Sequence, residues 1–154
     1  MITVINQQTG ISEAVFSGSG RRLTLFLETE SEPERDVGDH HWFECRASVE
    51  APAEDFHGAA VGGLLTSEVT DLVVALQALL RRGEGVELFV AMERWLSLSV
   101  QLHRHGQAAI VATVGGQAAE DIQIRVRVEA DLATLGDFVA RLAVLREADI
   151  APVT

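Results

Sequence analysis

The sequence contains no lysine and no tyrosine, and all 12 of its basic residues are arginine. The absence of lysine excludes Schiff-base chemistry, a phosphate-loop lysine and a lysine general base, and the absence of tyrosine excludes a phenolic acid. The single cysteine, Cys45, cannot form an internal disulfide, which agrees with a reducing compartment. Because Cys45 lies between Phe43 and Ala47 in an alternating stretch, we expect a core thiol rather than a nucleophile.

The chain also lacks a long hydrophobic run, since stretches such as Leu72 to Ala75 are far shorter than a membrane span. Residues 1–8 show neither the basic segment nor the apolar run of a secretory signal. We therefore expect a soluble, cytoplasmic protein without a membrane partner. At 154 residues, of which 47% are hydrophobic, the chain is long enough to bury its own core, and we expect residues 1–154 to form a single domain.

Acidic residues outnumber basic ones, and the formal net charge is −11. The excess is concentrated in one short segment, which contains six acidic residues and a single basic residue, Arg35. These acids are Glu28, Glu30, Glu32, Glu34, Asp36 and Asp39. A protein that binds nucleic acid neutralises phosphates with clustered cations, so nucleic acid is not an expected partner, whereas a basic protein is. A solvated loop between two strands is the alternative interpretation of this segment.

Two stretches in the N-terminal third alternate apolar and polar side chains and predict strands over residues 22–29 and 42–50. A turn signal precedes the first of them, so residues 14–16 are expected to form a short partner strand. Pro52 ends the second strand, and the Gly-containing stretch from Glu54 to Gly63 is interpreted as turn and loop.

A leucine-rich apolar face predicts a helix that Thr66 or Ser67 caps and that ends near Arg82. Four alternating segments follow with short turns, over residues 86–90, 95–102, 107–114 and 121–129. Such short connections allow only antiparallel neighbours. Asp131 is the expected N-cap of a last helix. The sequence thus predicts an α+β fold: an antiparallel sheet of about six to seven strands with two packed helices, ordered strand–strand–helix–four-strand meander–helix.

Two tryptophans stand apart from the apolar pattern. Trp42 and Trp95 each have the opposite parity from the apolar residues of their strand, so we expect each to face solvent or a groove. Phe26 also has the parity of the polar residues of its strand. The three side chains are predicted to form an aromatic patch suited to a protein interface, unless a helix or the N-terminal strands cover that face of the sheet.

The remaining motifs do not complete a catalytic or metal site. His103 and His105 have a spacing used by some metal sites, but His105 abuts Gly106 in a predicted turn and no nearby cysteine or carboxylate completes a ligand set. The stretch from Gly58 to Gly63 lacks the lysine of a phosphate cradle, and no serine lies in a G-x-S-x-G elbow. We assign no catalytic, cofactor-binding or metal-binding residue and expect a non-enzymatic protein.

Several segments together carry a family resemblance: the strand that opens with Trp42, the helix near Thr70-Asp71-Leu72, Gly85 to Val90 leading into Trp95-Leu96-Ser97-Leu98, the small-residue strand from Ala108 to Val114, and the Asp131-Leu132 start of the last helix. In this order they resemble the bacterial immunity proteins that accompany wall-associated contact-dependent toxins, a domain of unknown function. The resemblance covers Trp42 to Leu145 apart from the stretch Glu54 to Gly63, and it does not extend to the N-terminal forty residues.

The resemblance implies an inhibitor that occludes a cognate toxin, often a nuclease or another enzyme acting inside the cell. A basic toxin domain would then dock on the six acids named above together with Trp42 and Trp95. Two alternatives stay open: an acidic secretion-type chaperone that dimerises and holds an unfolded client, and a domain with a small-molecule or enzymatic role, marked by a pocket with perturbed carboxylates or histidines. The patterns leave open the order of the strands, whether they form a single sheet or a sandwich, and the oligomeric state.

Overall fold

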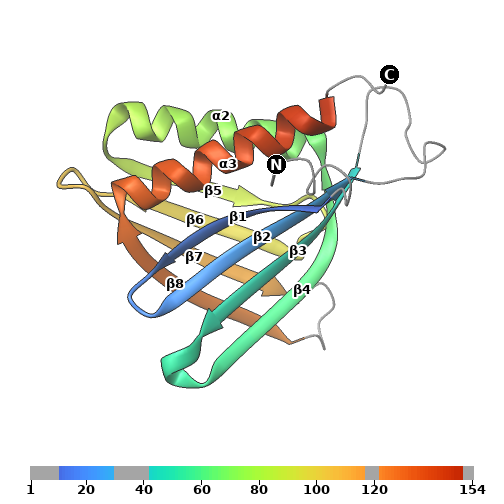
Figure 1. Ribbon diagram of the computed structural model, residues 1–154, viewed down its shortest axis with the longest axis horizontal. Helices are drawn as coiled ribbons and strands as arrows, with labels where there is room; N and C mark the ends of the chain where they lie inside the picture. Colours follow the sequence, from blue (N-terminus) through green and yellow to red (C-terminus); the bar gives the residue numbers. More distant parts are fainter. Residues whose placement is uncertain (1–10, 30–41, 117–121, 151–154) are drawn as a thin grey trace, which may run out of the picture.

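The computed structural model describes residues 11–29, 42–116 and 122–150. These residues form an α+β fold of two helices and eight strands in two four-stranded antiparallel sheets (Figure 1). In chain order the elements are β1 (Ile11–Gly18), β2 (Arg21–Thr29), β3 (Trp42–Ala51), the 3-10 helix η2 (Pro52–Glu54), β4 (Phe56–Leu65), α2 (Thr66–Arg82), β5 (Gly85–Val90), β6 (Leu96–Leu102), β7 (Gln107–Gly115), β8 (Gln123–Asp131) and α3 (Leu132–Ile150).

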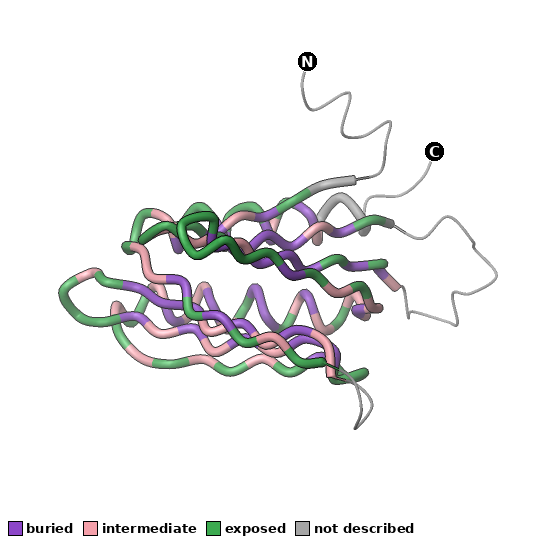
Figure 2. The backbone as a smooth tube through the Cα atoms, turned by 90° about the horizontal axis from the view of Figure 1, so that it is seen from below, coloured by how far each residue is buried: buried purple, intermediate pink, exposed green. Residues whose placement is uncertain are grey.

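The strands β1 to β4 make the first sheet and β5 to β8 the second, each in sequence order. The sheets lie as two separate layers with the core between them (Figure 2), and their strands cross in the view of Figure 1. The helices α2 and α3 lie side by side, with α3 against the edge strand β1 of the first sheet and α2 against the edge strand β5 of the second. One continuous cluster of buried apolar side chains is shared by both sheets and both helices. None of the helices in the described ranges is long and apolar enough to cross a membrane.

The choice between a single sheet and a sandwich, which the sequence leaves open, falls on two packed sheets. The expected number of six to seven strands is too low, because the sequence indicates a loop where the structure forms strand β4. Its inward positions include Gly58 and Gly62, which lack the apolar side chains that mark a strand in the sequence. Glycine is found at these positions because side chains of the second sheet approach closely. A Cβ at Gly58, for example, would collide with the side chain of Ile124 in β8. With β4 paired to β3, helix α2 separates the two groups of four strands, and each group forms its own sheet.

Trp95 joins the two sheets at one corner. Its indole covers the inner side of β4, where a Cβ at Gly62 would collide with the ring, and its Nε1 donates a 3.0 Å hydrogen bond to the carbonyl oxygen of Gly63. The carbonyl oxygen of Trp95 in turn accepts a 2.8 Å hydrogen bond from the N–H of Gly115 at the end of β7. This residue therefore fixes β4 of the first sheet against β6 and β7 of the second.

A carboxylate of α2 reinforces the same corner. Glu68 Oε1 accepts a 2.9 Å hydrogen bond from the N–H of Leu65, and its Oε2 accepts a 2.6 Å bond from the N–H of Met92 in the β5–β6 connection. The N-cap position of α2 is Leu65, so the prediction of Thr66 or Ser67 as the cap is wrong. Because leucine has no polar side chain, Glu68 does the capping from inside the first turn.

The opposite corner is closed around Arg21, in the β1–β2 hairpin. Its guanidinium donates to the carbonyl oxygen of Arg127 in β8 at 3.0 Å and pairs with both carboxylate oxygens of Glu54 at 2.8 and 3.0 Å. Nearby, Gly18 approaches the carbonyl oxygen of Glu129 so closely that no Cβ fits between them. An exposed ion pair contributes little by itself, and the role of this one is to hold the hairpin, η2 and β8 in one arrangement.

The last helix covers the free edge of β1. Phe138 packs edge-on against Phe16 with ring centroids 6.0 Å apart, and Arg141 Nε donates a 2.9 Å hydrogen bond to the carbonyl oxygen of Glu13. The helix begins as predicted: the carboxylate of Asp131 accepts hydrogen bonds from the backbone N–H and the hydroxyl of Thr134, at 2.9 and 2.8 Å. An edge covered in this way cannot pair with a foreign strand.

The substitution Gly62→Ala should destabilise the fold by about 1–3 kcal/mol, because the added methyl group forces Trp95 out of its place and overpacks the corner. As a matched control, Gly136→Ala in α3 meets nothing within 4 Å and should stabilise by about 0.5–1 kcal/mol through helix propensity. Urea denaturation measures both changes. Equal effects of the two substitutions would contradict the close approach of Trp95 to β4.

The cap at Asp131 should make stability depend on pH. Hydrogen bonds from the backbone and then the hydroxyl of Thr134 lower the pKa of Asp131 from its usual 3.8, so the folded state binds this proton more weakly than the unfolded state. The stabilisation is present above pH 3.8 and disappears as the pH falls through the lowered pKa. Thermal melting should show Asp131→Ala less stable than the wild type at pH 7, with the gap narrowing as the pH falls below 3.8. Asp131→Asn, which keeps a capping oxygen, should lose less at pH 7.

Candidate protein-binding surface

The acidic segment is the connection between β2 and β3. Of its six acids, Glu28 lies in β2, whereas Glu30, Glu32, Glu34, Asp36 and Asp39 lie outside the described residues. Trp42 opens β3 at the other end of the connection. Both flanking side chains belong to the outer face of the first sheet, since Glu28 is exposed and Trp42 shares the parity of exposed Glu44. The structure thus places two of the predicted binding residues on one face, at the same end of the sheet.

Two carboxylates face each other on this surface. Glu28 pairs directly with Glu44 in the register of β2 and β3, and both side chains are exposed. Like charges in directly opposite positions of an antiparallel pair destabilise it. The nearest cation by register is Arg46, which lies over the ring of Phe26 at 5.8 Å and makes no ion pair with either carboxylate. Within the described residues, the repulsion between Glu28 and Glu44 is therefore not relieved.

Trp42 lies beside these acids. Its indole covers the outer side of Gly63, where a Cβ would meet ring atoms at 3.0 and 3.1 Å. The carboxylate of Glu93 approaches the same position to 3.1 Å, so Glu93 lies next to the tryptophan ring. We call the set formed by Glu28, Trp42, Glu44 and Glu93 the acidic tryptophan surface. It combines a half-buried aromatic side chain with three carboxylates.

The expected exposure of Trp95 is wrong. The residue precedes β6, which begins at Leu96, so the parity of the strand does not apply to it. The connection turns the side chain into the core, where it is 1% exposed. Trp95 and Trp42 consequently lie on opposite faces of β4, over Gly62 and Gly63 respectively, and the predicted aromatic patch of Phe26 and both tryptophans does not form.

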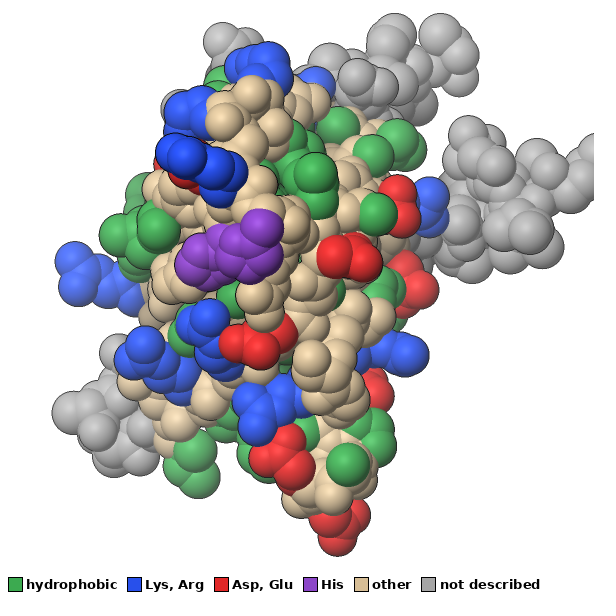
Figure 3. Space-filling model, turned by 90° about the vertical axis from the view of Figure 1, so that its left-hand side faces the viewer, with side chains coloured by type: hydrophobic (Ala, Val, Ile, Leu, Met, Phe, Trp, Pro, Cys, Tyr) green, Lys and Arg blue, Asp and Glu red, His purple; other side chains and the backbone are tan. Residues whose placement is uncertain are grey.

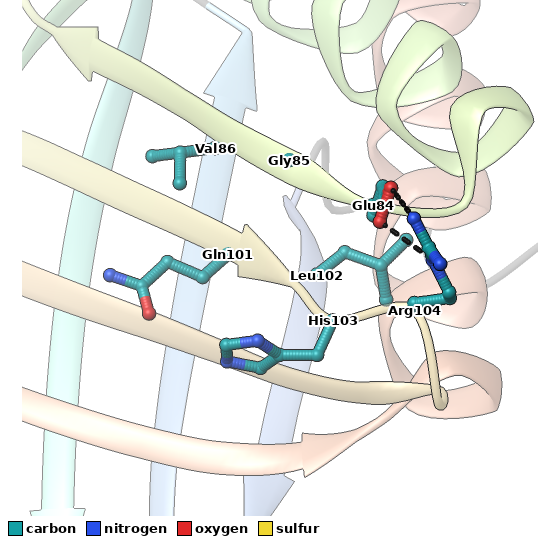
Figure 4. Close-up of a pocket in the computed structure, with 7 residues that line it drawn as sticks. All are labelled: Glu84, Gly85, Val86, Gln101, Leu102, His103 and Arg104. Carbon is teal, nitrogen blue, oxygen red and sulfur yellow. Dashed lines mark hydrogen bonds and ion pairs between the residues drawn. The ribbon is translucent and has the colours of Figure 1, made fainter.

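His103, His105 and an open depression lie elsewhere, at the β6–β7 end of the second sheet. Figure 3 shows histidine side chains grouped on one side of the molecule. The rings of His103 and His105 stack at 5.6 Å with 20° between their planes, an orientation in which their nitrogens do not converge. An open depression of about 330 Å³ lies beside them, with Val86 and His103 in its lining and an ion pair between Arg104 and Glu84 at 3.1 and 3.2 Å on its rim (Figure 4). Because Arg104 is 87% exposed, this pair is well screened by solvent.

Nucleophilic side chains are poorly placed for chemistry. Burial raises the pKa of the Cys45 thiol to about 12, so it stays protonated at neutral pH, as expected of a core thiol. Ser48 lies 3.3 Å from Nε2 of His57, but the serine is 4% exposed. No carboxylate among the described residues hydrogen-bonds to that histidine to orient it. The described part of the chain also contains no cluster of three or more potential metal ligands.

Sequence reasoning missed two members of the acidic tryptophan surface. Glu44 could have been found, because it has the same strand parity as Trp42. Its position opposite Glu28 depends on the pairing register, which parity alone does not specify. Glu93 had no sequence signal, because it reaches the surface only across β4, the strand that was interpreted as a loop.

The architecture defines a class: an α+β protein of two packed four-stranded antiparallel sheets, closed at one end by two helices. The model of the WapI-like immunity protein family matches residues 14–147, so this chain belongs to the WapI-like immunity protein family. The match includes the N-terminal strands and β4, which the sequence resemblance did not. No curated protein and no solved structure matches the chain. Family membership implies neutralisation of a cognate toxin, and such immunity proteins are typically not enzymes.

The opposed carboxylates yield a prediction about stability. Glu44→Gln removes one charge of the Glu28–Glu44 pair and should stabilise the protein by about 0.2–0.5 kcal/mol at low ionic strength. The gain should shrink in about 0.5 M NaCl, where the Debye length is only a few ångströms. Thermal melts at the two salt concentrations measure it. Asp137→Gln, at an exposed position of α3, is the control and should not show this salt-dependent gain.

Proposed function

We propose that this chain neutralises its toxin by stoichiometric binding, with the acidic tryptophan surface and the adjoining acidic segment as the docking site for a basic toxin domain. Membership of the WapI-like immunity protein family implies that the partner is a cognate toxin. The observation that supports this site is the direct opposition of Glu28 and Glu44 beside Trp42, with no ion pair to either carboxylate among the described residues. An exposed pair of like charges costs stability in the free protein, and a cation from a partner would remove that cost on binding.

Charge also favours a basic partner. The segment from Glu28 to Asp39 carries six acids and one base, and Glu44 and Glu93 extend the negative charge onto the sheet and the β5–β6 connection. A surface with this charge accelerates the encounter with a basic domain through electrostatic steering, and the acceleration falls with ionic strength. The bound immunity protein then inhibits by steric occlusion, because a domain of this size covers the toxin surface that acts on its substrate.

Trp42 is the expected anchor of the contact. Tryptophan is enriched among the residues that dominate binding energy at protein interfaces, particularly where neighbouring groups exclude water from it. Here Gly63 supports one side of the indole and carboxylates flank it, so the ring is held in place before a partner arrives. A preorganised aromatic side chain loses little entropy on binding.

The test measures binding and inhibition of the toxin domain encoded beside this chain's gene. The double variant Glu28→Arg/Glu44→Arg should lower the association rate at least tenfold in about 50 mM salt and flatten its dependence on salt, because the steering field is reversed where the partner docks. Reversing four acids between Glu30 and Asp39 should have the same effect. Trp42→Ala should instead accelerate dissociation, because it removes the anchor and leaves the charges in place.

The matched control is Asp71→Arg/Asp137→Arg, which changes the net charge equally but on the exposed sides of α2 and α3. If the control slows association as much as Glu28→Arg/Glu44→Arg, only the net charge matters and the docking site is wrong. If the wild type protects the toxin's target at far less than one equivalent, stoichiometric occlusion is wrong as well.

A further inference from the structure

The strand β5 exposes the residues that its sequence pattern would bury. Val86, Leu88 and Val90 are 55%, 76% and 62% exposed, whereas Glu87 and Phe89, on the other face, are half-buried. Apolar residues at alternate positions of a strand normally mark the side that faces the core. In β5 this rule is reversed, and a row of aliphatic side chains points to solvent at an end strand of the second sheet.

The neighbouring strands continue this surface without charge. Ser99 of β6 and Val111 of β7 lie level with Leu88 in the register, and every other outward side chain of these two strands is a hydroxyl, an amide, a small aliphatic group or glycine. We call the outward side chains of β5, β6 and β7 the uncharged face. A chain with 23 acids and 12 bases has thus kept the outward face of three adjacent strands free of both. Depletion of charge is characteristic of interface cores.

The helix α2 limits how a partner can approach. Its end is tied to β5 by the ion pair between Arg82 and Glu87 at 3.0 Å, and its start is tied to the following connection by the bond between Glu68 and the N–H of Met92. The helix therefore runs along β5 and hinders the addition of another strand to its edge. The part of β5 that remains accessible is its outer face, so a partner packs onto the sheet face to face.

We propose that the uncharged face is the interface of a homodimer, in which it packs on the same face of a second copy around a two-fold axis. Charge distinguishes the two candidate occupants of this face, a second copy of the chain and the toxin. Two copies with a net charge of −11 each repel one another, and contact is least opposed where neither contributes a charge. A basic toxin gains no attraction here, because the two arginines of the adjoining strand β8, Arg125 and Arg127, are balanced by its two carboxylates, Glu129 and Asp131, with Glu129 paired to Arg127 at 2.8 Å.

The area of the face sets the strength of the dimer. Three strands about 4.8 Å apart and about 20 Å long present a flat footprint of roughly 300 Å². Stable interfaces bury about 800 Å² of accessible surface on each partner, so even with Met92 and the side chains of β8 this contact belongs to the weak class. The expected dimer forms at tens to hundreds of micromolar protein and dissociates on dilution.

The dimer leaves the acidic tryptophan surface free. The uncharged face and the acidic tryptophan surface belong to the outer faces of different sheets, which point in opposite directions from the core (Figure 2). The two interfaces also respond oppositely to salt. Screening weakens attraction to a basic toxin, but it strengthens self-association of an acidic chain by reducing repulsion between the copies.

Sedimentation velocity from about 5 to 500 µM protein tests the proposal. The average mass of the wild type should rise toward twice the monomer value, and the rise should be steeper in about 0.5 M than in about 0.05 M NaCl. Leu88→Arg buries one charge from each copy within the interface and should stay monomeric throughout. Its thermal stability should match the wild type, because the replaced side chain is 76% exposed. The control Val61→Arg, at a 61% exposed valine on the end strand β4, should still dimerise.

Chemical shifts give a second test that needs no variant. Backbone amide shifts of the wild type should change with concentration in β5, β6 and β7 and stay constant in β1 to β4. A wild type that is monomeric at every concentration and salt overturns the proposal, as does a dimer that Leu88→Arg leaves intact. A monomeric wild type whose binding to its toxin is lost in Leu88→Arg also overturns it, because the toxin is then the occupant of this face.

Discussion

The packing of Trp95 on β4 is the contact on which the arrangement of the two sheets depends. The indole needs glycine at position 62 to admit the ring, and its Nε1 donates a hydrogen bond to the backbone carbonyl oxygen of Gly63. This contact draws β4 toward β6 and β7, while Glu68 fixes the start of α2 to the same corner. The second corner, around Arg21, is built from exposed polar contacts and close backbone approach, so the buried tryptophan carries more of the free energy that joins the sheets.

Elements whose signal is local could be predicted from the sequence. The alternating strands, the apolar face of α2 and the cap at Asp131 depend on residues close together in the chain, and the structure confirms them. Strand β4 could not be found, because what makes it a strand is the approach of Trp95 and Ile124 to its glycines, and glycine by itself indicates a turn. The exposure predicted for Trp95 failed for a related reason: parity applies only within a strand, and this residue lies before one.

The same limit applies to the candidate surface. Charge and parity indicated Glu28 and Trp42 correctly as members of one face, but the opposition of Glu28 and Glu44 is a property of register. In β5 the pattern is present and its usual meaning is reversed, since Leu88 points to solvent and Glu87 toward α2. Places where a local rule fails without a gain in the folded monomer indicate that another requirement acts. The proposed binding roles are what the exposed aliphatic groups of β5 and the opposed carboxylates of β2 and β3 have in common.

The two proposed binding surfaces lie on different sheets. The first sheet tolerates opposed carboxylates because its inner face is fully apolar, and the free energy of the core lies in Leu23, Leu25 and Leu27 rather than in the exposed pairs. The second sheet carries aliphatic groups outward at a single end strand, where α2 hinders pairing with foreign strands and so limits the risk of aggregation. A core closed at both corners makes each outer face independent of the other. The fold can therefore carry an acidic surface on one sheet and an uncharged one on the other without a change to its core.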